Sequence, residues 1–578
     1  MLKEFRTLLP LARRFLPHYI LGVLCLLITN AGELYIPQLL RRATDTMAQG
    51  NFSLTDIGYL ALTMAGIALG VAAARFGWRF FIQGASRRIE ATMRRQLFDH
   101  LLKLSPSFYS TMKTGDIMAR ATNDMHAIRM ASGMALVAFM DGLFLTIAIL
   151  IILFSTYPLL AAVTIIPLPF ITIIVLFTGK IIGRRFRLVQ EGFASLSEQV
   201  REAAAGIRVI KSFVKESYVQ KMFRDANGDY RDRNMSLVKL WGLFFPLVGF
   251  ISGLTILLLL LYGGSGVVDG RFTPGDFVAF MSYLNMLRWP VVGMGFTVNM
   301  IQRGAASLAR INAILDEQPE ITSPETPTSL TPSGDIKVTG LTYSYPGSEP
   351  ILQDISFSVS QGETLGILGR TGSGKTTLVH LLPRLLDPPQ GKISFGGRDV
   401  HDYDLHQLRS SISFVSQDSF LFSDTVRENI SFGNPDASEE AIQHAAELST
   451  ISRELYQLPK GWDTEVGERG VTLSGGQKQR ITISRAVLMD REVLILDDGM
   501  SAVDTETEEQ ILTSLLEYRK GKTNIIVSHR VSTLQHAHQV IVLDQGRIIQ
   551  RGTHRDLIEQ EGMYRDIYRL QQAERSSG

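Results

Sequence analysis

The sequence has only one cysteine and comparatively few charged side chains for its length. Cys25 cannot form an internal disulfide, and it lies in an apolar run where a packing role is typical. Charged residues make up 20% of the 578 positions, below the roughly 25% of soluble proteins. The chain is also too long for one ordinary domain, so we expect part of it to avoid water. The net charge of +2 argues neither for nor against nucleic-acid binding.

Long apolar runs occur in the first 300 residues. Each of the six runs is near the ~20 residues that span a ~30 Å hydrocarbon core. Pro246 and Pro290 slightly favour buried helices of a large soluble core, but the length and grouping of the runs favour membrane spans. We therefore predict a membrane domain over 1–314, with no cleavable signal, because the first run is long enough to remain as an anchor. The predicted spans are about 19–40, 56–76, 135–154, 159–179, 240–262 and 277–300.

Lysine and arginine predict the orientation of these spans. Basic residues precede the first span and are dense over 87–129 and 180–239, so these segments are expected in the cytoplasm. Arg41 and Arg42, after the first span, go against this rule. An even number of spans leaves both termini in the cytoplasm. The two polar segments, each about 50 residues and helical in character, would project tens of ångströms from the membrane, at ~1.5 Å per residue.

A phosphate-binding loop follows the apolar run 364–368, which is typical of a buried strand. Its glycines let backbone N–H groups turn toward phosphate, and the helix expected from Lys375 points its positive end at the same anion. Lys375 would reach the terminal phosphates of ATP, and Thr376 would bind Mg²⁺. The motif consists of Gly369, Arg370, Thr371, Gly372, Ser373, Gly374, Lys375 and Thr376, and Thr377 follows it.

A second apolar run, 493–496, leads into Asp497 and Asp498. Asp497 at the end of that strand would hold Mg²⁺ through water, and the next residue would activate the attacking water. Asp498 is one methylene, about 1.5 Å, shorter than the glutamate that hydrolysis favours. A misplacement near 1 Å can cost ~100-fold in rate. We therefore expect slow hydrolysis at this site, unless a local adjustment lets Asp498 act as the base.

Proline-rich residues 315–335 indicate a linker, and the alternating strand and helix patterns of 336–578 predict an α/β domain with a mostly parallel sheet. The motifs of this half, in their order, resemble those of one family. Over essentially its full length the chain resembles a half-transporter of the ATP-binding cassette (ABC) exporters, of the multidrug-resistance type. The matching residues are Tyr345, Gln417, the signature Leu473, Ser474, Gly475, Gly476 and Gln477, the loop 501–504 ending in Asp504, and His529.

The resemblance implies roles for these residues. Tyr345 would stack on adenine, Gln417 and His529 would act beside Asp498 at the terminal phosphate, and Gln417 would also approach the metal. The signature would contact ATP held by a second subunit, so a partner half-transporter is implied. The segment 464–470 resembles an exporter-specific loop, and 114–116 and 206–213 resemble the helices that couple the two domains. In bacteria such proteins reside in the cytoplasmic membrane.

The intact signature and the shorter Asp498 together resemble the degenerate member of a bacterial heterodimeric pair. A slow homodimer remains the alternative, because Gln417 and His529 are retained. An ATP-gated channel or regulatory subunit would also suit slow hydrolysis. A soluble ATPase acting on nucleic acid is excluded if the six runs do span a membrane.

Three ionisable residues inside predicted spans, Glu33, Asp141 and Arg288, are costly in hydrocarbon. They would pair with one another, Arg288 with either acid, or contact an amphipathic substrate. Aromatic and methionine side chains near Arg288 would suit varied apolar ligands, although such side chains are more often simple packing. They are Tyr283, Met286, Trp289, Met294 and Phe296.

Overall fold

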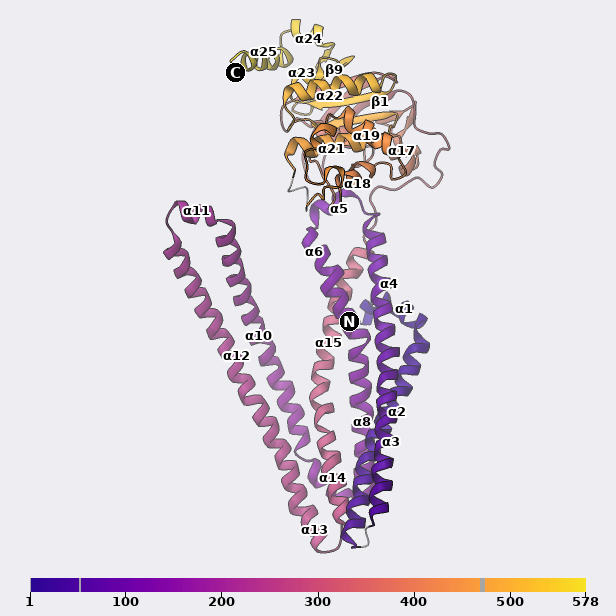
Figure 1. The fold of residues 1–578 in the computed structure, drawn as a ribbon, viewed down its shortest axis with the longest axis vertical. Coiled ribbons are helices and arrows are strands. Elements are labelled where there is room, and N and C mark those ends of the chain that lie inside the picture. Colours follow the sequence, from indigo (N-terminus) through magenta and orange to yellow (C-terminus); the bar gives the residue numbers. More distant parts are fainter. Residues whose placement is uncertain (1, 51–52, 468–472, 578) are drawn as a thin grey trace. The chain divides into compact units, whose positions relative to one another are not determined.

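The computed structural model describes residues 2–50, 53–467 and 473–577 and divides the chain into two compact units (Figure 1). The first unit comprises Met1–Leu102 and Lys113–Glu317. The second comprises Lys103–Met112 and Gln318–Gly578.

The first unit is helical throughout its regular structure (Figure 1). Its main helices are α1 (Leu8–Arg14), α2 (Leu16–Ala48), α3 (Leu54–Trp78), α4 (Gly84–Leu101), α6 (Thr114–Ala119), α7 (Met125–Ser132), α8 (Met134–Thr156), α9 (Pro158–Ile165), α10 (Leu168–Ala205), α11 (Ile207–Ser212), α12 (Glu216–Leu258), α13 (Gly264–Val268), α14 (Pro274–Met286) and α15 (Arg288–Leu315). Two π-turns, Arg79–Gln83 and Arg120–Asp124, continue α3 into α4 and α6 into α7.

Four continuous helices among the described residues are long and apolar enough to cross a membrane: Leu16–Ala48, Leu54–Leu101, Thr114–Thr156 and Glu216–Val268. They contain the first, second, third and fifth predicted spans. The predicted spans 159–179 and 277–300 instead cover helix breaks, one at Pro167 between α9 and α10 and one at Leu287 between α14 and α15. Proline lacks the N–H that a continuing helix needs, which explains the break at Pro167. Six spans therefore remain a prediction.

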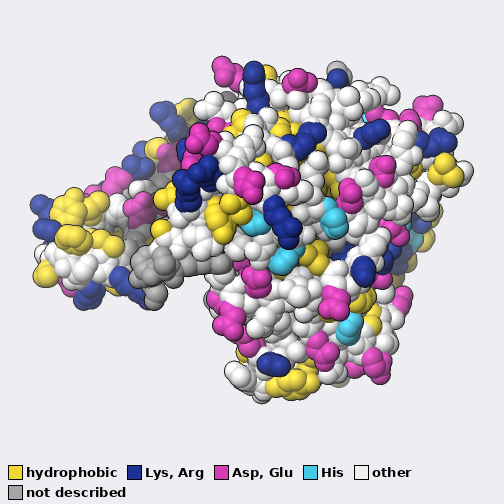
Figure 2. All heavy atoms as spheres, turned by 90° about the horizontal axis from the view of Figure 1, so that it is seen from above, with side chains coloured by type: hydrophobic (Ala, Val, Ile, Leu, Met, Phe, Trp, Pro, Cys, Tyr) yellow, Lys and Arg dark blue, Asp and Glu magenta, His cyan; other side chains and the backbone are white. Residues whose placement is uncertain are grey.

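Helices α10 and α12 lie side by side as a long hairpin that α11 closes at its far end (Figure 1). With 38 and 43 residues, they are about 57 and 65 Å long. Arg185 donates to the carbonyl of Ser236 at 2.8 Å, and Phe193 packs on Tyr230. The end of the hairpin carries exposed apolar side chains, including Phe213, and Figure 2 shows hydrophobic side chains gathered there among lysines and arginines.

The second unit contains two sheets. The six-stranded sheet has the order β10-β9-β3-β8-β7-β6 and is parallel except for β10, as the sequence predicts for most of its strands. Its strands are β3 (Thr364–Gly369), β6 (Ile412–Val415), β7 (Val493–Asp497), β8 (Thr523–Ser528), β9 (Gln539–Asp544) and β10 (Arg547–Gly552). The antiparallel sheet, in the order β2-β1-β4-β5, contains β1 (Ile336–Tyr343), β2 (Leu352–Val359), β4 (Ile393–Phe395) and β5 (Arg398–Asp399).

Helices complete this unit. They are α16 (Lys375–Leu381), α17 (Leu405–Ser410), α18 (Val426–Ser431), α19 (Glu439–Leu448), α20 (Ser452–Leu455), α21 (Gly475–Leu488), α22 (Thr505–Tyr518), α23 (Val531–Leu534), α24 (His554–Glu559) and α25 (Met563–Ser577). Strands β3, β7 and β8 are buried along their whole length, since apolar clusters cover both faces of the parallel sheet. This double burial is why the strands appear in the sequence as continuous apolar runs.

A short piece of chain between α4 and α6 belongs to the second unit. It contains α5 (Pro106–Thr111), and Ser107 donates a hydrogen bond to Glu320 at 2.5 Å. The hydroxyl of Ser105 accepts from the backbone N–H of Ile321 at 3.1 Å. The predicted coupling segment 114–116 lies directly after this piece, in α6 of the first unit.

Candidate nucleotide-binding site

The phosphate loop joins β3 to α16, as predicted. Gly372 and Gly374 have φ of 83° and 100°, a region that glycine adopts at little cost. A Cβ on Gly369 would lie 2.4 Å from the carbonyl oxygen of Leu543, so this position also requires glycine. Arg370 and Thr371 are exposed, whereas Ser373 is buried and its hydroxyl has no hydrogen-bond partner among the described residues. The loop is therefore built as a backbone cradle.

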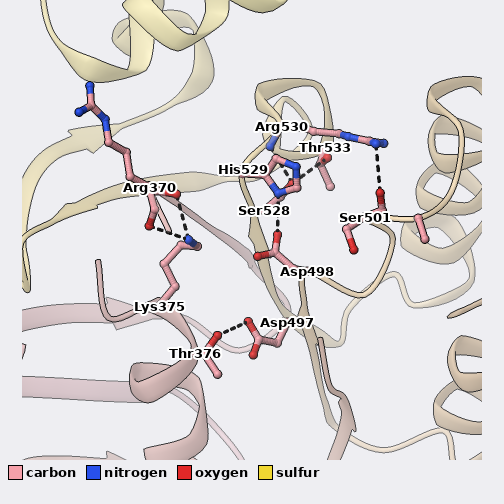
Figure 3. A network of polar contacts seen from close by, with 12 residues as sticks. Arg370, Lys375, Thr376, Asp497, Asp498, Ser501, Ser528, His529, Arg530 and Thr533 are labelled. Carbon is pink, nitrogen blue, oxygen red and sulfur yellow. Dashed lines mark hydrogen bonds and ion pairs between the residues drawn. The ribbon is translucent and has the colours of Figure 1, made fainter. Parts of the chain in front are cut away.

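Lys375 folds back over this loop. Its ammonium donates to the carbonyls of Gly369 and Arg370 at 2.9 and 3.1 Å (Figure 3). Burial lowers the pKa of Lys375, and the negative charges of Asp498 and Asp497 oppose that shift. The cation is thus held over the cradle, where an anionic phosphate would meet it.

Thr376 and Asp497 come together as the sequence predicts for a metal site. The Thr376 hydroxyl donates to Asp497 Oδ1 at 3.2 Å (Figure 3). Asp497 is fully buried, and its Oδ2 has no hydrogen-bond partner in the described part of the chain. Burial raises the pKa of Asp497 to about 6. A hydroxyl and a carboxylate with one unpartnered buried oxygen form a donor pair that suits Mg²⁺.

Asp498 follows β7 with a φ of 45°, which is unusual for a residue with a side chain. Its N–H donates to the carbonyl of Val527 at 3.1 Å, which fixes the turn against β8. Its carboxylate Oδ1 lies 3.2 Å from Nδ1 of His529 (Figure 3). The structure therefore pairs the two residues that the sequence places beside the terminal phosphate.

Strand register explains how distant motifs reach one place. In the parallel sheet Leu368 lies opposite Ser528, Asp497 opposite Val527, and Val415 opposite Leu496. The phosphate loop, the acidic pair and His529 therefore leave the same carboxyl edge, where α/β sheets bind ligands. Gln417 leaves that edge too, two residues after β6, with an exposed side chain.

The predicted adenine contact lies beside the start of α16. The hydroxyl of Tyr345 is 3.2 Å from that of Thr377, and the ring packs edge-on against Tyr343 at 5.5 Å. Tyr345 was predicted from the family resemblance, and Thr377 because it follows the phosphate loop. The structure brings both residues to the nucleotide cradle.

The signature begins helix α21. Ser474 and Gln477 form a capping box, with the backbone N–H of Gln477 donating to the Ser474 hydroxyl at 3.2 Å. Gln477 also donates to Glu454 at 3.0 Å, and Leu473 is buried in a separate apolar cluster. Gly475 and Gly476 pack on Ala502, where a Cβ on Gly476 would lie 2.9 Å from its carbonyl oxygen. The exporter-specific loop preceding the signature lies partly outside the described residues, at 468–470.

The loop 501–504 is tied to two of these motifs by residues that the sequence analysis did not select. Gln479 on α21 donates to the Ser501 hydroxyl at 3.0 Å and accepts from the N–H of Ala502 at 2.8 Å. Asp504 caps α22 by accepting from the N–H of Thr507 at 2.9 Å.

Arg530 links the loop 501–504 to the turn that contains His529. It donates to the carbonyls of Ser501 and Val503 at 3.3 and 3.0 Å and pairs with the buried Glu508 on α22 (Figure 3). Arg530 directly follows His529 and Gln479 lies two residues after the signature, and that nearness was the available sequence signal.

The surroundings of the three ionisable residues in predicted spans are described to different extents. Glu33 pairs with Arg75 of α3, which the sequence analysis overlooked. Asp141 lies within electrostatic range of Glu33 and Arg75. The side chain of Arg288 lies outside the described residues, as do those of Trp289 and Met294.

The described apolar ligand candidates differ in exposure. Tyr283 is buried and donates to the carbonyl of Leu34 at 2.8 Å, so it is a packing residue in this structure. Met286 is half-buried, whereas Phe296 is exposed.

Comparison with known proteins agrees with this geometry. Residues 19–291 match the model of the ABC transporter transmembrane region, and residues 352–501 match that of the ABC transporter. A curated relative, the probable multidrug resistance ABC transporter ATP-binding/permease protein YheI of Bacillus subtilis, is 39% identical over 96% of this chain and 95% of its own. The chain belongs to the ABC transporter family.

Two further relatives support this membership. The multidrug resistance-like ATP-binding protein MdlA of Escherichia coli is 37% identical over 97% of this chain and 95% of its own. The solved structure of a bacterial Atm1-family ABC exporter with ATP bound is 27% identical, with a TM-score of 0.77 over 97% of this chain and 98% of that one. This ABC transporter is therefore a multi-pass membrane protein with a fused ATPase domain. As a half-transporter, it requires a second half.

Proposed function

We propose that this ABC transporter is one half of an exporter that uses ATP to move amphipathic or hydrophobic compounds, drugs or lipids, out of the cytoplasm or inner leaflet. Relatives named for multidrug resistance, and an ATP-dependent lipid A-core flippase of Syntrophus aciditrophicus at 32% identity, support this substrate class. The proposed location is a bacterial cytoplasmic membrane, with six spans over 1–314 and both termini in the cytoplasm.

We further propose that its own ATP site is degenerate and hydrolyses slowly. Asp498 carries this proposal. It stands where a base must reach the attacking water, and its short carboxylate is engaged with His529 at 3.2 Å. Mg²⁺ held near Thr376 and Asp497 would neutralise phosphate charge. The chain's own groups would bind the nucleotide, while the signature around Ser474 completes a competent site on a different partner chain that has glutamate at this position.

Asp498→Glu tests the degenerate site in the purified full-length protein. The added methylene should raise ATP turnover by roughly 10-fold to 100-fold, while ATP affinity stays unchanged. Asp498→Asn should leave the slow wild-type rate nearly unaltered. Fast wild-type turnover that collapses in Asp498→Asn would overturn the proposal, because Asp498 would then be a working base.

The pairing of Asp498 with His529 favours a second candidate, a slow homodimer in which this carboxylate does act. Co-expression with a neighbouring half-transporter that has an Asp-Glu pair separates the two candidates. In a heterodimer, Ser474→Ala on this chain should lower hydrolysis at the partner's site. In the homodimer, the chain alone should elute as a dimer and lose its own slow turnover in the same variant.

A further inference from the structure

The backbone on either side of Arg530 is held by one side chain of the C-terminal helix. Gln571 of α25 donates from Nε2 to the carbonyl of His529 at 2.9 Å. Its Oε1 accepts from the backbone N–H of Val531, also at 2.9 Å. The amide thus uses a donor and an acceptor to clamp the turn that begins with His529.

Helix α25 is itself anchored, so the clamp has a fixed base. Tyr564 in its first turn is fully buried, and its hydroxyl lies 2.7 Å from Nδ1 of His554 on α24. The N–H of Tyr564 donates to Gln550 of β10 at 3.0 Å. Gln571 therefore projects from a helix that is attached to the edge of the parallel sheet.

Other residues hold the backbone on either side of His529, whereas the His529 side chain can still rotate. Ser528 donates to Thr533 and accepts from the N–H of Arg530, at 3.1 and 3.0 Å. Arg530 is held by Glu508. The side chain of His529 is 53% exposed and touches Asp498 through one 3.2 Å contact. Its direction therefore depends on the orientation of its backbone, and Gln571 bonds to the carbonyl of that residue.

We propose that Gln571 is a positioning residue that aims His529 at Asp498 and at the terminal phosphate of ATP. It makes no contact with nucleotide in this role; it acts through the backbone of His529. The inference rests on the proposed ATP-hydrolysing function and adds the C-terminal helix to the catalytic apparatus. Because a displacement near 1 Å can cost ~100-fold in rate, losing the clamp should affect turnover more than ATP binding.

The test compares Gln571→Met with Gln572→Met in the full-length protein. Methionine nearly preserves the shape of glutamine but removes both hydrogen bonds, and Gln572 is the exposed neighbour on the same helix. Gln571→Met should lower kcat roughly tenfold, with KM for ATP within about twofold of the control. Gln571→Glu keeps the acceptor for Val531 but loses the donor to His529, and it should be equally slow.

A double substitution separates positioning from general damage. In a His529→Ala background, Gln571→Met should add no further loss, because the two residues act in series. An additional loss of the same size there, or an unchanged kcat in both Gln571 variants, would overturn the inference.

Repeating the set with Asp498→Glu keeps the two proposals apart. If Asp498→Glu fails to raise turnover, the degenerate-site proposal is wrong. The role of Gln571 is judged separately, by comparing Gln571→Met with Gln572→Met once with Asp498 and once with glutamate at that position. Radiolabelled ATP followed over hours is sensitive enough for the slow turnover that we expect of the wild type.

Discussion

At the scale of single residues, Asp497 shows how burial prepares a ligand. Its carboxylate lies at the end of a fully buried strand, and desolvation raises its pKa to about 6. The Thr376 hydroxyl and the nearby Lys375 oppose that rise, and Asp498 adds to it. A raised pKa in an acid means that the proton is held more tightly, so a proton competes with a cation at this position.

We therefore predict that Mg²⁺-dependent ATP affinity falls as the pH is lowered through about 6. Between pH 7 and 5 the loss should be roughly tenfold, since Asp497 changes from mostly charged to mostly neutral. Asp497→Asn should bind more weakly and lack this part of the pH dependence. Titration of the nucleotide itself is common to both proteins and cancels in the comparison. Equal pH profiles for wild type and Asp497→Asn in a fluorescent-nucleotide binding assay would contradict the prediction.

Residues within motifs were predictable from sequence because glycine, lysine and carboxylate chemistry restricts which types can occupy a phosphate cradle. Residues outside the motifs that position them through hydrogen bonds or ion pairs could not be predicted. Gln571 is separated from His529 by 42 positions, and only tertiary contact reveals their hydrogen bond. Arg75 was overlooked because it lies near the end of an apolar run, where its pairing with Glu33 of another helix is invisible in sequence.

At the scale of elements, the buried Glu508 links two loops. Through Arg530 it holds the turn after β8 against the loop 501–504, and Gln479 joins that loop to the signature helix α21. Motifs that this chain uses for its own ATP are thereby connected to the signature.

Glu508→Gln should weaken this link. The substitution keeps the volume but removes the charge that faces Arg530, so we expect a loss of about 1–3 kcal/mol in stability and roughly tenfold slower turnover in the assembled transporter. Thermal unfolding and ATPase assays measure the two effects. Glu509→Gln, at the exposed neighbouring position, is the control. Identical melting temperature and turnover in the two variants would show that the link is unimportant.

Element types were largely predictable, whereas the two helix breaks were missed although a proline lies at or just after each of them. Strands covered on both faces appear as continuous apolar runs, so β3 and β7 were readily recognised. The break between α14 and α15 lies at Leu287, three residues before Pro290, which has no N–H to donate to the carbonyl of Met286. Arg41, which opposed the orientation rule, pairs with the buried Asp276 of α14 at 2.8 Å. Because Arg41 is neutralised by an ion pair, its position says little about which side of the membrane it faces.

At the scale of the whole molecule, the hairpin α10–α12 has a tip that needs a partner surface. Phe213 at the end of α11 is 69% exposed, and Val209 and Val214 beside it are exposed too. Apolar side chains gathered at a polar tip typically mark an interaction site. The resemblance of 206–213 to a coupling helix suggests a groove in an ATPase domain as its partner.

We predict that Phe213→Ala uncouples ATP hydrolysis from transport. Removing the ring takes away the apolar surface that would transmit movement, but Phe213 belongs to the helical unit and the phosphate loop to the other. Nucleotide affinity should therefore stay within about twofold of wild type, as expected for a surface change outside the binding motifs. Transport of a fluorescent amphipathic dye into inside-out vesicles should fall by roughly tenfold for the loss of a large apolar contact, with a much smaller change in ATPase rate. Met235→Ala, an exposed position on α12 and 19 residues beyond its start, is the matched control. Parallel loss of ATPase and transport in Phe213→Ala, or loss of nucleotide binding, would mean that Phe213 supports folding rather than coupling.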